Sequence, residues 1–212
     1  MEVQLSTLEL ILAAAEEEFL SKGYEAASLR EIVRKAGVTT GALYGYFKNK
    51  HELFGALVDE EYHFVQQIFE EILDEFNALP VEQQTEHMQE YTEKGMRRMA
   101  DYIYDHWNAF RLILCRSEGT DYCHLVEEMT EREVRATDDF SETSKEAGVS
   151  FRKVNVTLER MLTYSMFSNY FAMVRQDLPR EETDQYISQL LEFYMAGWNG
   201  LWGPGTGNKV LN

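Results

Sequence analysis

The chain contains few of the residues that mark secreted, membrane-spanning or metal-binding proteins. It has 2 cysteines among 212 residues, too few for a disulfide framework, and Cys123-His124 lacks the further ligands of a zinc site. No apolar run approaches the roughly 18 residues that a membrane span needs, and the first residues lack the basic start of a signal peptide. We therefore expect a soluble cytoplasmic protein with no metal, no cofactor and no membrane partner.

Positive charge is also scarce, which at first argues against a nucleic-acid partner. The chain has 20 Lys and Arg against 37 Asp and Glu, a net charge of -17, whereas a DNA-binding protein normally shows a basic surface. The charges are unevenly distributed, because residues 22–50 hold six Lys or Arg and two Glu, a local charge of +4. Residues 1–21 contain no Lys or Arg, so we expect no basic N-terminal arm in a minor groove. Any DNA affinity should depend strongly on salt.

The apolar residues recur at helical spacing along nearly the whole chain, and we see no strand. Capping patterns at Ser6 with Glu9 and at Ser28 with Glu31 predict two helix starts. Gly, Pro and polar clusters predict the helix ends. The predicted fold is all-α with about nine helices, which run from Ser6 to about Lys22 and over 28–36, 39–47, 49–77, 82–105, 107–117, 121–147, 151–177 and 181–202.

Residues 28–54 have the layout of a helix-turn-helix: an eight-residue helix, a turn with Gly37, and a second short helix. Leu43 and Phe47, four residues apart, would anchor the second helix to the core. Its other side chains form a small, neutral surface without carboxylates, as suits a helix in a major groove: Thr40, Gly41, Ala42, Tyr44 and Gly45. Hydroxyls and cations suited to phosphates surround it: Ser28, Thr39, Tyr46, Lys48 and Lys50.

Residues 37–53, Gly-Val-Thr-Thr-Gly-Ala-Leu-Tyr-Gly-Tyr-Phe-Lys-Asn-Lys-His-Glu-Leu, closely resemble the signature of TetR-family regulators. The resemblance is specific over residues 8–57 and only architectural beyond. It implies that Thr39 to Phe47 is the recognition helix, with Arg30, Thr40, Gly41, Ala42 and Tyr44 contacting bases. It also implies that Ser28, Thr39, Tyr46 and Lys50 contact phosphates.

The same resemblance predicts the domain organisation and the role of the acidic part of the chain after residue 54. We expect a DNA-binding domain at 1–54, a helical effector-binding and dimerisation domain at 55–202, and a flexible tail at 203–212. Aromatic and apolar residues of the last helices predict a homodimer interface: Tyr170, Val174, Tyr186, Leu190, Phe193, Gly197, Trp198 and Leu201. Methionines and aromatics of the middle helices predict a pocket for a small effector: Met96, Met99, Tyr102, Ile103, Trp107, Phe110, Met161, Ser165, Met166 and Asn169.

These features together predict a ligand-responsive repressor that binds a palindromic operator as a homodimer. Helix 49–77 would link the DNA-binding domain to the effector-binding domain. One alternative is a small-molecule or protein-binding helical module that no longer reads DNA. An enzyme is not expected: Glu60-x-x-His63 has the spacing of a di-iron ligand pair, but no second pair follows. There is also no nucleophile elbow or phosphate-binding loop. The operator and the effector stay open.

Overall fold

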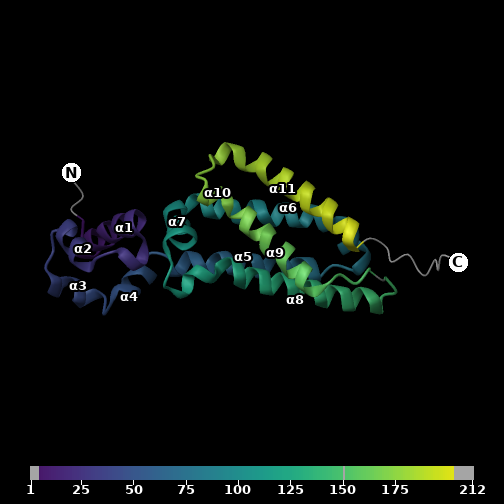
Figure 1. The fold of residues 1–212 in the computed structure, drawn as a ribbon, viewed down its shortest axis with the longest axis horizontal. Coiled ribbons are helices and arrows are strands. Elements are labelled where there is room, and N and C mark those ends of the chain that lie inside the picture. The colour runs from purple at the N-terminus through teal and green to yellow at the C-terminus, as the bar shows by residue number, and fades with distance from the viewer. Residues whose placement is uncertain (1–4, 150, 203–212) are drawn as a thin grey trace. The chain divides into compact units, whose positions relative to one another are not determined.

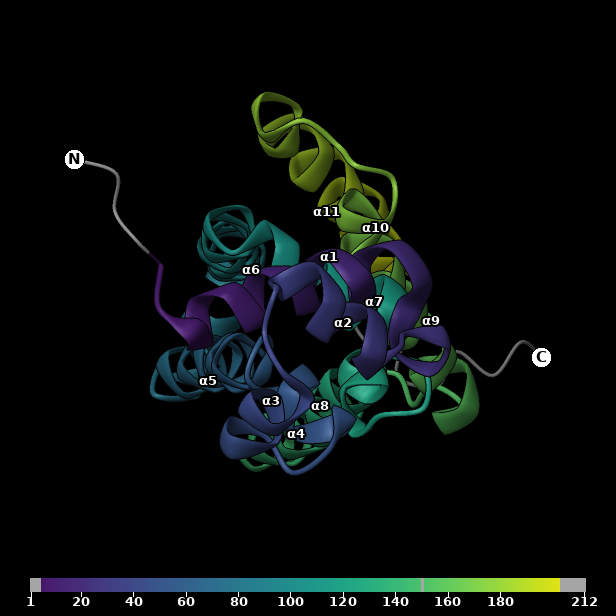
Figure 2. The same ribbon diagram turned by 90° about the vertical axis from the view of Figure 1, so that its left-hand side faces the viewer.

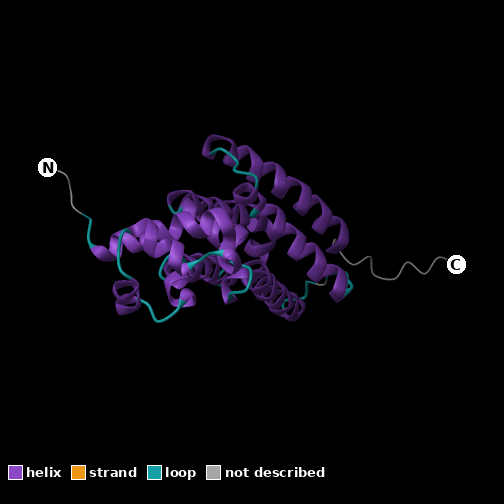
Figure 3. Ribbon diagram, turned by 60° about the vertical axis from the view of Figure 1, so that its left-hand side comes forward, coloured by secondary structure: helices purple, strands orange, loops and turns teal. Residues whose placement is uncertain are grey.

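The computed structural model describes residues 5–149 and 151–202, apart from the side chains of Glu82 and Thr85, and in these ranges its regular elements are all helices, with no strand (Figure 3). The predicted tail at 203–212 lies outside the described residues. The all-α prediction is confirmed, and nine helices of the described chain have seven residues or more: α1 (Thr7–Ala26), α2 (Leu29–Ala36), α3 (Thr40–Tyr46), α5 (Asp59–Asn77), α6 (Val81–Asp105), α7 (Trp107–Arg116), α8 (Leu125–Glu146), α9 (Val156–Tyr170) and α11 (Arg180–Trp202).

Shorter pieces complete the chain (Figure 1). They are α4 (Lys50–Gly55), the 3₁₀ turn η1 (Asp121–His124) and α10 (Ala172–Arg175). No helix in the described part of the chain is long and apolar enough to cross a membrane.

The residues group into two compact units, which we describe separately. The first comprises Met1–Val65 and Tyr102–Leu125, and the second Gln66–Asp101 and Val126–Asn212. This grouping is not sequential, because α5 and α6 contribute residues to both units. The functional boundary after residue 54 stays a prediction.

Local hydrogen bonds define the helix starts in the first unit. Ser6 and Glu9 form the expected capping box, in which the Glu9 amide donates to Ser6 Oγ at 3.3 Å and the Ser6 amide to Glu9 Oε2 at 2.7 Å. Thr39 caps α3 through the Ala42 amide at 3.1 Å, and Asn49 caps α4 through the Glu52 amide at 2.8 Å. Each cap satisfies an amide that has no partner within its helix.

The capping box expected at Ser28 does not form. Ser28 is the residue before α2, but its hydroxyl makes no capping hydrogen bond. Its backbone amide donates instead to the carboxylate of Glu18 at 3.4 Å, and Glu31 pairs with Arg34 at 2.8 Å. The tertiary partner Glu18 therefore replaces the local one.

Apolar side chains from α1 to α4 form the core of the first unit around aromatic contacts. Phe19 and Phe54 are both fully buried, and their rings meet edge to face with centroids 5.0 Å apart. Ile32 of α2 and Leu43 of α3 are also fully buried. This core holds α2 and α3 in place on either side of a short turn (Figure 2).

Three predicted helices are interrupted, and in each the apolar pattern continues through the break. Residues 56–58 turn tightly between α4 and α5, with Val58 buried and its amide bonded to the carbonyl oxygen of Gly55 at 3.0 Å. Asn155 caps α9 through the Leu158 amide at 3.1 Å, so that the helix begins after 151–155. A 3₁₀ turn precedes α8. The predictions of unbroken helices over 49–77, 121–147 and 151–177 are wrong at these points.

The break between α9 and α10 has a clear packing reason. Tyr170 and Phe171 are adjacent in sequence and both are fully buried. Consecutive residues point about 100° apart on a helix, and the change in backbone course at Phe171 allows both rings to enter the core. Tyr170 then donates a hydrogen bond to the carbonyl oxygen of Met96 on α6 at 2.8 Å.

Gly37 forms the turn between α2 and α3 in a left-handed conformation, with φ of 66° and ψ of 27°. We expect Gly37→Ala to lower the free energy of unfolding by about 1–2 kcal/mol, because side chains disfavour this conformation. A Cβ added there would meet nothing within 4 Å, so the cost is conformational. Urea unfolding followed by circular dichroism measures it.

Gly45 provides the matched control, since it lies within helix α3 and a Cβ there also meets nothing within 4 Å. Gly45→Ala should raise stability by up to about 1 kcal/mol, because alanine loses less backbone entropy. Equal effects of the two substitutions would contradict the role assigned to the turn.

Candidate nucleic-acid interface and ligand cavity

Helix α3 presents the surface that the sequence predicts for reading bases. Leu43 and Phe47 are buried, while Tyr44 and Tyr46 are 53% and 51% exposed. Thr40 and Gly41 are exposed and Ala42 is partly exposed, and α3 contains no acidic residue. The structure therefore brings the predicted base-contact residues of α3 together on one exposed face.

Arg30 lies on α2 and is exposed. Four of the six cations in residues 22–50 are used in ion pairs with glutamates: Lys22, Arg34, Lys35 and Lys48. Arg30 is the one of the six that makes neither an ion pair nor a hydrogen bond with any residue that the structure describes. Its guanidinium is free to meet a partner from outside.

The two predicted phosphate-binding lysines differ in their freedom. The Lys48 side chain is 87% exposed and pairs loosely with Glu52, at 3.4 Å. Lys50 Nζ donates instead to the carbonyl oxygens of Glu25 at 3.0 Å and Ala27 at 3.3 Å, and lies 4.7 Å from the ring centroid of Tyr24. An ammonium has three donors, so Lys50 holds the end of α1 with two of them and has one left.

Glu18 is the buried partner of two of these paired cations. Its carboxylate is almost fully buried and pairs with Lys22 at 2.8 Å and Lys35 at 3.2 Å. The Lys22 hydrogen bond lowers its pKa most strongly, and burial opposes that shift. A buried carboxylate needs such partners, because leaving it unpaired is costly. The main role of these two lysines is therefore to neutralise a buried carboxylate.

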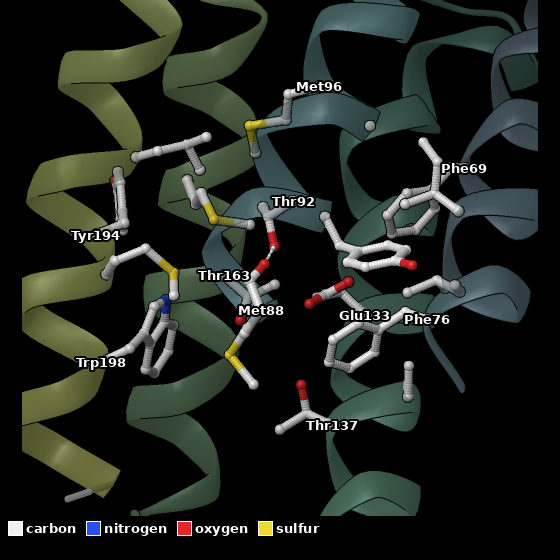
Figure 4. A pocket seen from close by; sticks show the side chains of 18 of the residues that line it. Phe69, Phe76, Met88, Thr92, Met96, Glu133, Thr137, Thr163, Tyr194 and Trp198 are labelled. Carbon is white, nitrogen blue, oxygen red and sulfur yellow. Dashed lines mark hydrogen bonds between the residues drawn. The ribbon is translucent and has the colours of Figure 1, made fainter. Parts of the chain in front are cut away.

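The second unit contains a cavity of about 120 Å³. Residues of α5, α6, α8, α9 and α11 line it, and most are aromatic, aliphatic or methionine side chains (Figure 4). Of the ten predicted pocket residues, Met96, Met99 and Met166 line this cavity.

The other predicted pocket residues lie elsewhere. Four of them belong to the first compact unit: Tyr102, Ile103, Trp107 and Phe110. Met161 is 65% exposed, and Asn169 is also exposed and donates to the hydroxyl of Tyr194 at 2.8 Å. Ser165 is half-buried and bonds to the same hydroxyl at 3.0 Å. A methionine and aromatic pattern marks burial, but it does not tell which buried space stays open.

Glu133 of α8 was not foreseen as a site residue, although it is the charged residue among those that line the cavity. Its carboxylate lies beside the ring of Phe76 in Figure 4, and it makes no hydrogen bond or ion pair within the described chain. Burial raises its pKa to about 7. The signal was present in the sequence: Met129, Glu133, Ala136 and Phe140 recur at three- and four-residue steps, placing an acid on an apolar stripe.

The predicted dimer residues divide into an outer and an inner group. Phe193 is 72% exposed and Gly197 is exposed, while Tyr186, Leu190 and Leu201 are at least partly exposed. Tyr170, Val174 and Trp198 are instead buried within the second unit. Further exposed apolar side chains lie on α9, which hydrogen bonds to α11 through Asn169 and Tyr194 at 2.8 Å: Leu158, Met161 and Tyr164.

Among the described residues, no group of three or more His, Cys, Asp or Glu could hold a metal ion. Glu60 and His63, the spacing that resembles a di-iron ligand pair, both lie on α5, and His63 bonds locally to the carbonyl oxygen of Asp59 at 2.8 Å.

Comparison with known sequences identifies the N-terminal segment. Residues 11–57 match the family described as "Bacterial regulatory proteins, tetR family". Over 52 residues the chain is 44% identical to the HTH-type transcriptional repressor BepR of Brucella suis biovar 1 (strain 1330), a match that covers 24% of this chain and 25% of BepR. Over 49 residues it is 47% identical to the HTH-type transcriptional regulator TtgR of Pseudomonas putida, covering 23% of each chain. The match thus spans about a quarter of these relatives.

Comparison with solved structures extends over most of the chain. A TetR-family regulator from Streptomyces coelicolor A3 aligns with a TM-score of 0.59 and 17% identity, covering 92% of this chain and 93% of that one. FadR of Bacillus subtilis, crystallised with stearoyl-CoA, aligns with a TM-score of 0.55 and 17% identity, covering 89% and 97%. At these identities the likeness shows the fold.

The chain thus combines a helix-turn-helix arrangement of α2 and α3 with further helices, the fold of the solved structure from Streptomyces coelicolor A3. Residues 11–57 are thus similar to the N-terminal segment of the tetR family of bacterial regulatory proteins.

The raised pKa of Glu133 predicts a pH-dependent difference between the native chain and the Glu133→Gln variant. An acid whose folded-state pKa of about 7 exceeds its ordinary 4.5 stabilises the fold while protonated and loses that contribution as the pH rises through 7. The native chain should therefore lose on the order of 2–3 kcal/mol relative to the variant between about pH 4.5 and pH 8. Urea unfolding of both proteins across this range measures the difference. A constant difference would show that the carboxyl is already ionised at low pH.

Proposed function

We propose that this chain is a transcriptional repressor that binds a palindromic operator as a homodimer and is released by a small effector. The observation that carries the DNA-binding part is the exposed, acid-free face of α3, to which α2 adds Arg30, an exposed residue with no partner among the described residues. The second unit carries the support for the dimer and for release by an effector.

Base reading requires small side chains that approach the groove and a donor that discriminates. The exposed face of α3 carries Thr40, Gly41 and Ala42 at its first turn, which permits close approach of the helix N-terminus to base edges. Arg30 supplies a forked donor suited to guanine, the commonest specific contact in the major groove. Tyr44 offers an aromatic edge to a thymine methyl group or a hydroxyl to a phosphate.

Phosphate contacts would then orient α3 in the groove. Thr39, Tyr46 and Lys48 are at least partly exposed and flank α3, and Ser28 has a hydroxyl that does not cap α2. Because so few cations face outward, these hydroxyls carry a large share of the contacts. The net charge of -17 opposes association with a polyanion, so operator affinity should be modest.

A dimer follows from the short reading surface and from the exposed apolar side chains of the second unit. Two recognition helices specify an operator when they are paired at about one helical turn of DNA, roughly 34 Å. Phe193 on α11 and Met161 on α9 are 72% and 65% exposed on helices that contact each other. Large exposed apolar side chains that gather on adjacent elements mark an association surface.

Release by an effector requires that the ligand bind the free form better than the DNA-bound form. The cavity of the second unit offers the binding space. Helices α5 and α6 have residues in both units and provide the connection that we first assigned to an unbroken helix over 49–77. A coupling of about 1–3 kcal/mol would give a graded response.

Substitutions in the first unit separate base reading from phosphate binding. Arg30→Ala should lower affinity for the selected operator by about 1–3 kcal/mol and relax its sequence preference. Tyr46→Phe combined with Lys50→Ala should weaken binding to all sequences about equally. Selection from random DNA gives the operator, and fluorescence anisotropy gives the affinities.

Lys94→Ala is the charge control, because Lys94 lies on α6 in the second unit and should not change base preference. If DNA binding were indifferent to the changes at Arg30, Tyr46 and Lys50, the contact assignment would be wrong. Absence of any enriched palindrome would contradict the operator proposal itself.

A charge placed on the exposed apolar surface should separate the dimer. Phe193→Glu should shift the chain toward a monomer, because a carboxylate would be buried without a partner at the interface. Operator affinity should fall with it, since a monomer presents one reading helix. Analytical ultracentrifugation and anisotropy measure the two effects. Asn199→Glu adds the same charge about 120° away around α11 and should leave the dimer intact; a dimer that survives both changes must use another surface.

A further inference from the structure

The cavity of the second unit has one charged side chain in an otherwise apolar wall. Glu133 projects from α8 toward the space between Phe76 and Thr92 in Figure 4. The surrounding residues include Tyr91, Phe140 and Trp198. No Lys, Arg or His is among the described residues that line the cavity. The other titratable groups that face it are the hydroxyls of Tyr91 on α6 and Tyr194 on α11, and α5 and α9 contribute none.

The nearest cation in the sequence does not neutralise this carboxylate. Arg132 precedes Glu133 but pairs with Glu70 of α5. Glu133 itself has no hydrogen bond or ion pair in the described chain. In the first unit, by contrast, the buried Glu18 is paired with Lys22 and Lys35. Among the residues that the structure describes, the Glu133 carboxylate therefore has no counterion.

An unpaired carboxylate in apolar surroundings is costly when ionised. A ligand that brings a positive charge removes this cost and gains a charge-assisted contact in a space where water screens little. Aromatic rings add to the gain, because their faces attract cations. An anionic ligand would meet repulsion in the same place.

We propose that the cavity binds small organic cations, with an ammonium group paired to Glu133 and an aryl or alkyl body among the aromatic and methionine side chains. This names the ligand class of the effector site and so rests on the proposed function. The cavity of about 120 Å³ is smaller than the dry cavity of roughly 150 Å³ that accommodates benzene, so the enclosed part of the ligand is at most about one aromatic ring.

Protons compete with such a ligand for the same carboxylate. Burial raises the pKa of Glu133 to about 7, so a permanently charged cation should displace a proton when it binds near neutral pH. Its apparent affinity should fall about tenfold from pH 8 to pH 6, as the ionised fraction falls. A neutral ligand of the same shape should show no such dependence.

Three probes of similar size test the ligand class on the full chain without DNA. Benzyltrimethylammonium carries the positive charge, neopentylbenzene is its neutral isostere, and phenylacetate carries a negative charge. Calorimetry in buffers of different ionisation enthalpy measures affinity and proton release together. Trp198 and Trp202 line the cavity, so their fluorescence provides a second readout.

Two variants distinguish the effect of the carboxylate in the cavity from the effect of a negative charge elsewhere on α8. Glu133→Gln keeps the shape and removes the charge, and Glu127→Gln removes an equal charge from an exposed position of the same helix. We expect Glu133→Gln to lower the affinity for the cationic probe at least about tenfold and to abolish the pH dependence of that affinity. The affinity for the neutral probe should not change. Glu127→Gln should behave as the native chain. Unfolding curves confirm that both variants are folded.

Equal binding of the cationic and neutral probes, tighter binding of phenylacetate, no binding of any probe, or no effect of Glu133→Gln would each overturn the proposal. Operator affinity with and without benzyltrimethylammonium is measured separately. A cation that binds through Glu133 without weakening DNA binding would support the ligand class and reject effector release. Release of DNA by the probes without selectivity for the cation would support effector release and reject the ligand class.

Discussion

Helix α3 depends on the burial of Leu43 and Phe47, because a helix of seven residues is unstable by itself in water. Those two side chains bind α3 to the core formed by Phe19, Ile32 and Phe54. The cap at Thr39 and the left-handed turn at Gly37 then set where the helix starts and how it leaves α2. The neutral face of α3 is exposed as a consequence of this anchoring. The surface that we propose for DNA reading therefore depends on apolar packing.

Most of the cations in residues 22–50 have partners within the first unit. Two of its lysines neutralise the buried Glu18, and Lys50 binds the carbonyl oxygens at the end of α1. Few cations remain for DNA, and Arg30 is the one of the six in residues 22–50 that the described structure leaves without a partner. The proposed DNA contacts therefore rely on shape and specific donors more than on bulk electrostatic attraction, which agrees with the net charge of -17.

Two glutamates inside the helical units show how one residue type acquires opposite properties. Lys22, Lys35 and the Ser28 amide surround Glu18 and lower its pKa. Glu133 lies among aromatic and methionine side chains, and burial raises its pKa to about 7. The first glutamate is held within the fold by its partners. The second has no partner in the described chain, and that difference in surroundings is the physical basis for assigning it to ligand binding.

Local patterns in the sequence determined the helical class, the capping box at Ser6, the turn at Gly37 and the neutral face of α3. These features depend on residues three or four positions apart, whose interactions the spacing already specifies. Tertiary packing decided the rest: the breaks at 56–58 and at Phe171, the partner of the Ser28 amide, the engagement of Lys50 and the exposure of Phe193. It also decided which of the apolar residues enclose space and which fill it. Helical periodicity gives the direction of a side chain but not what stands opposite, so the sequence alone did not reveal that Glu133 faces an open cavity.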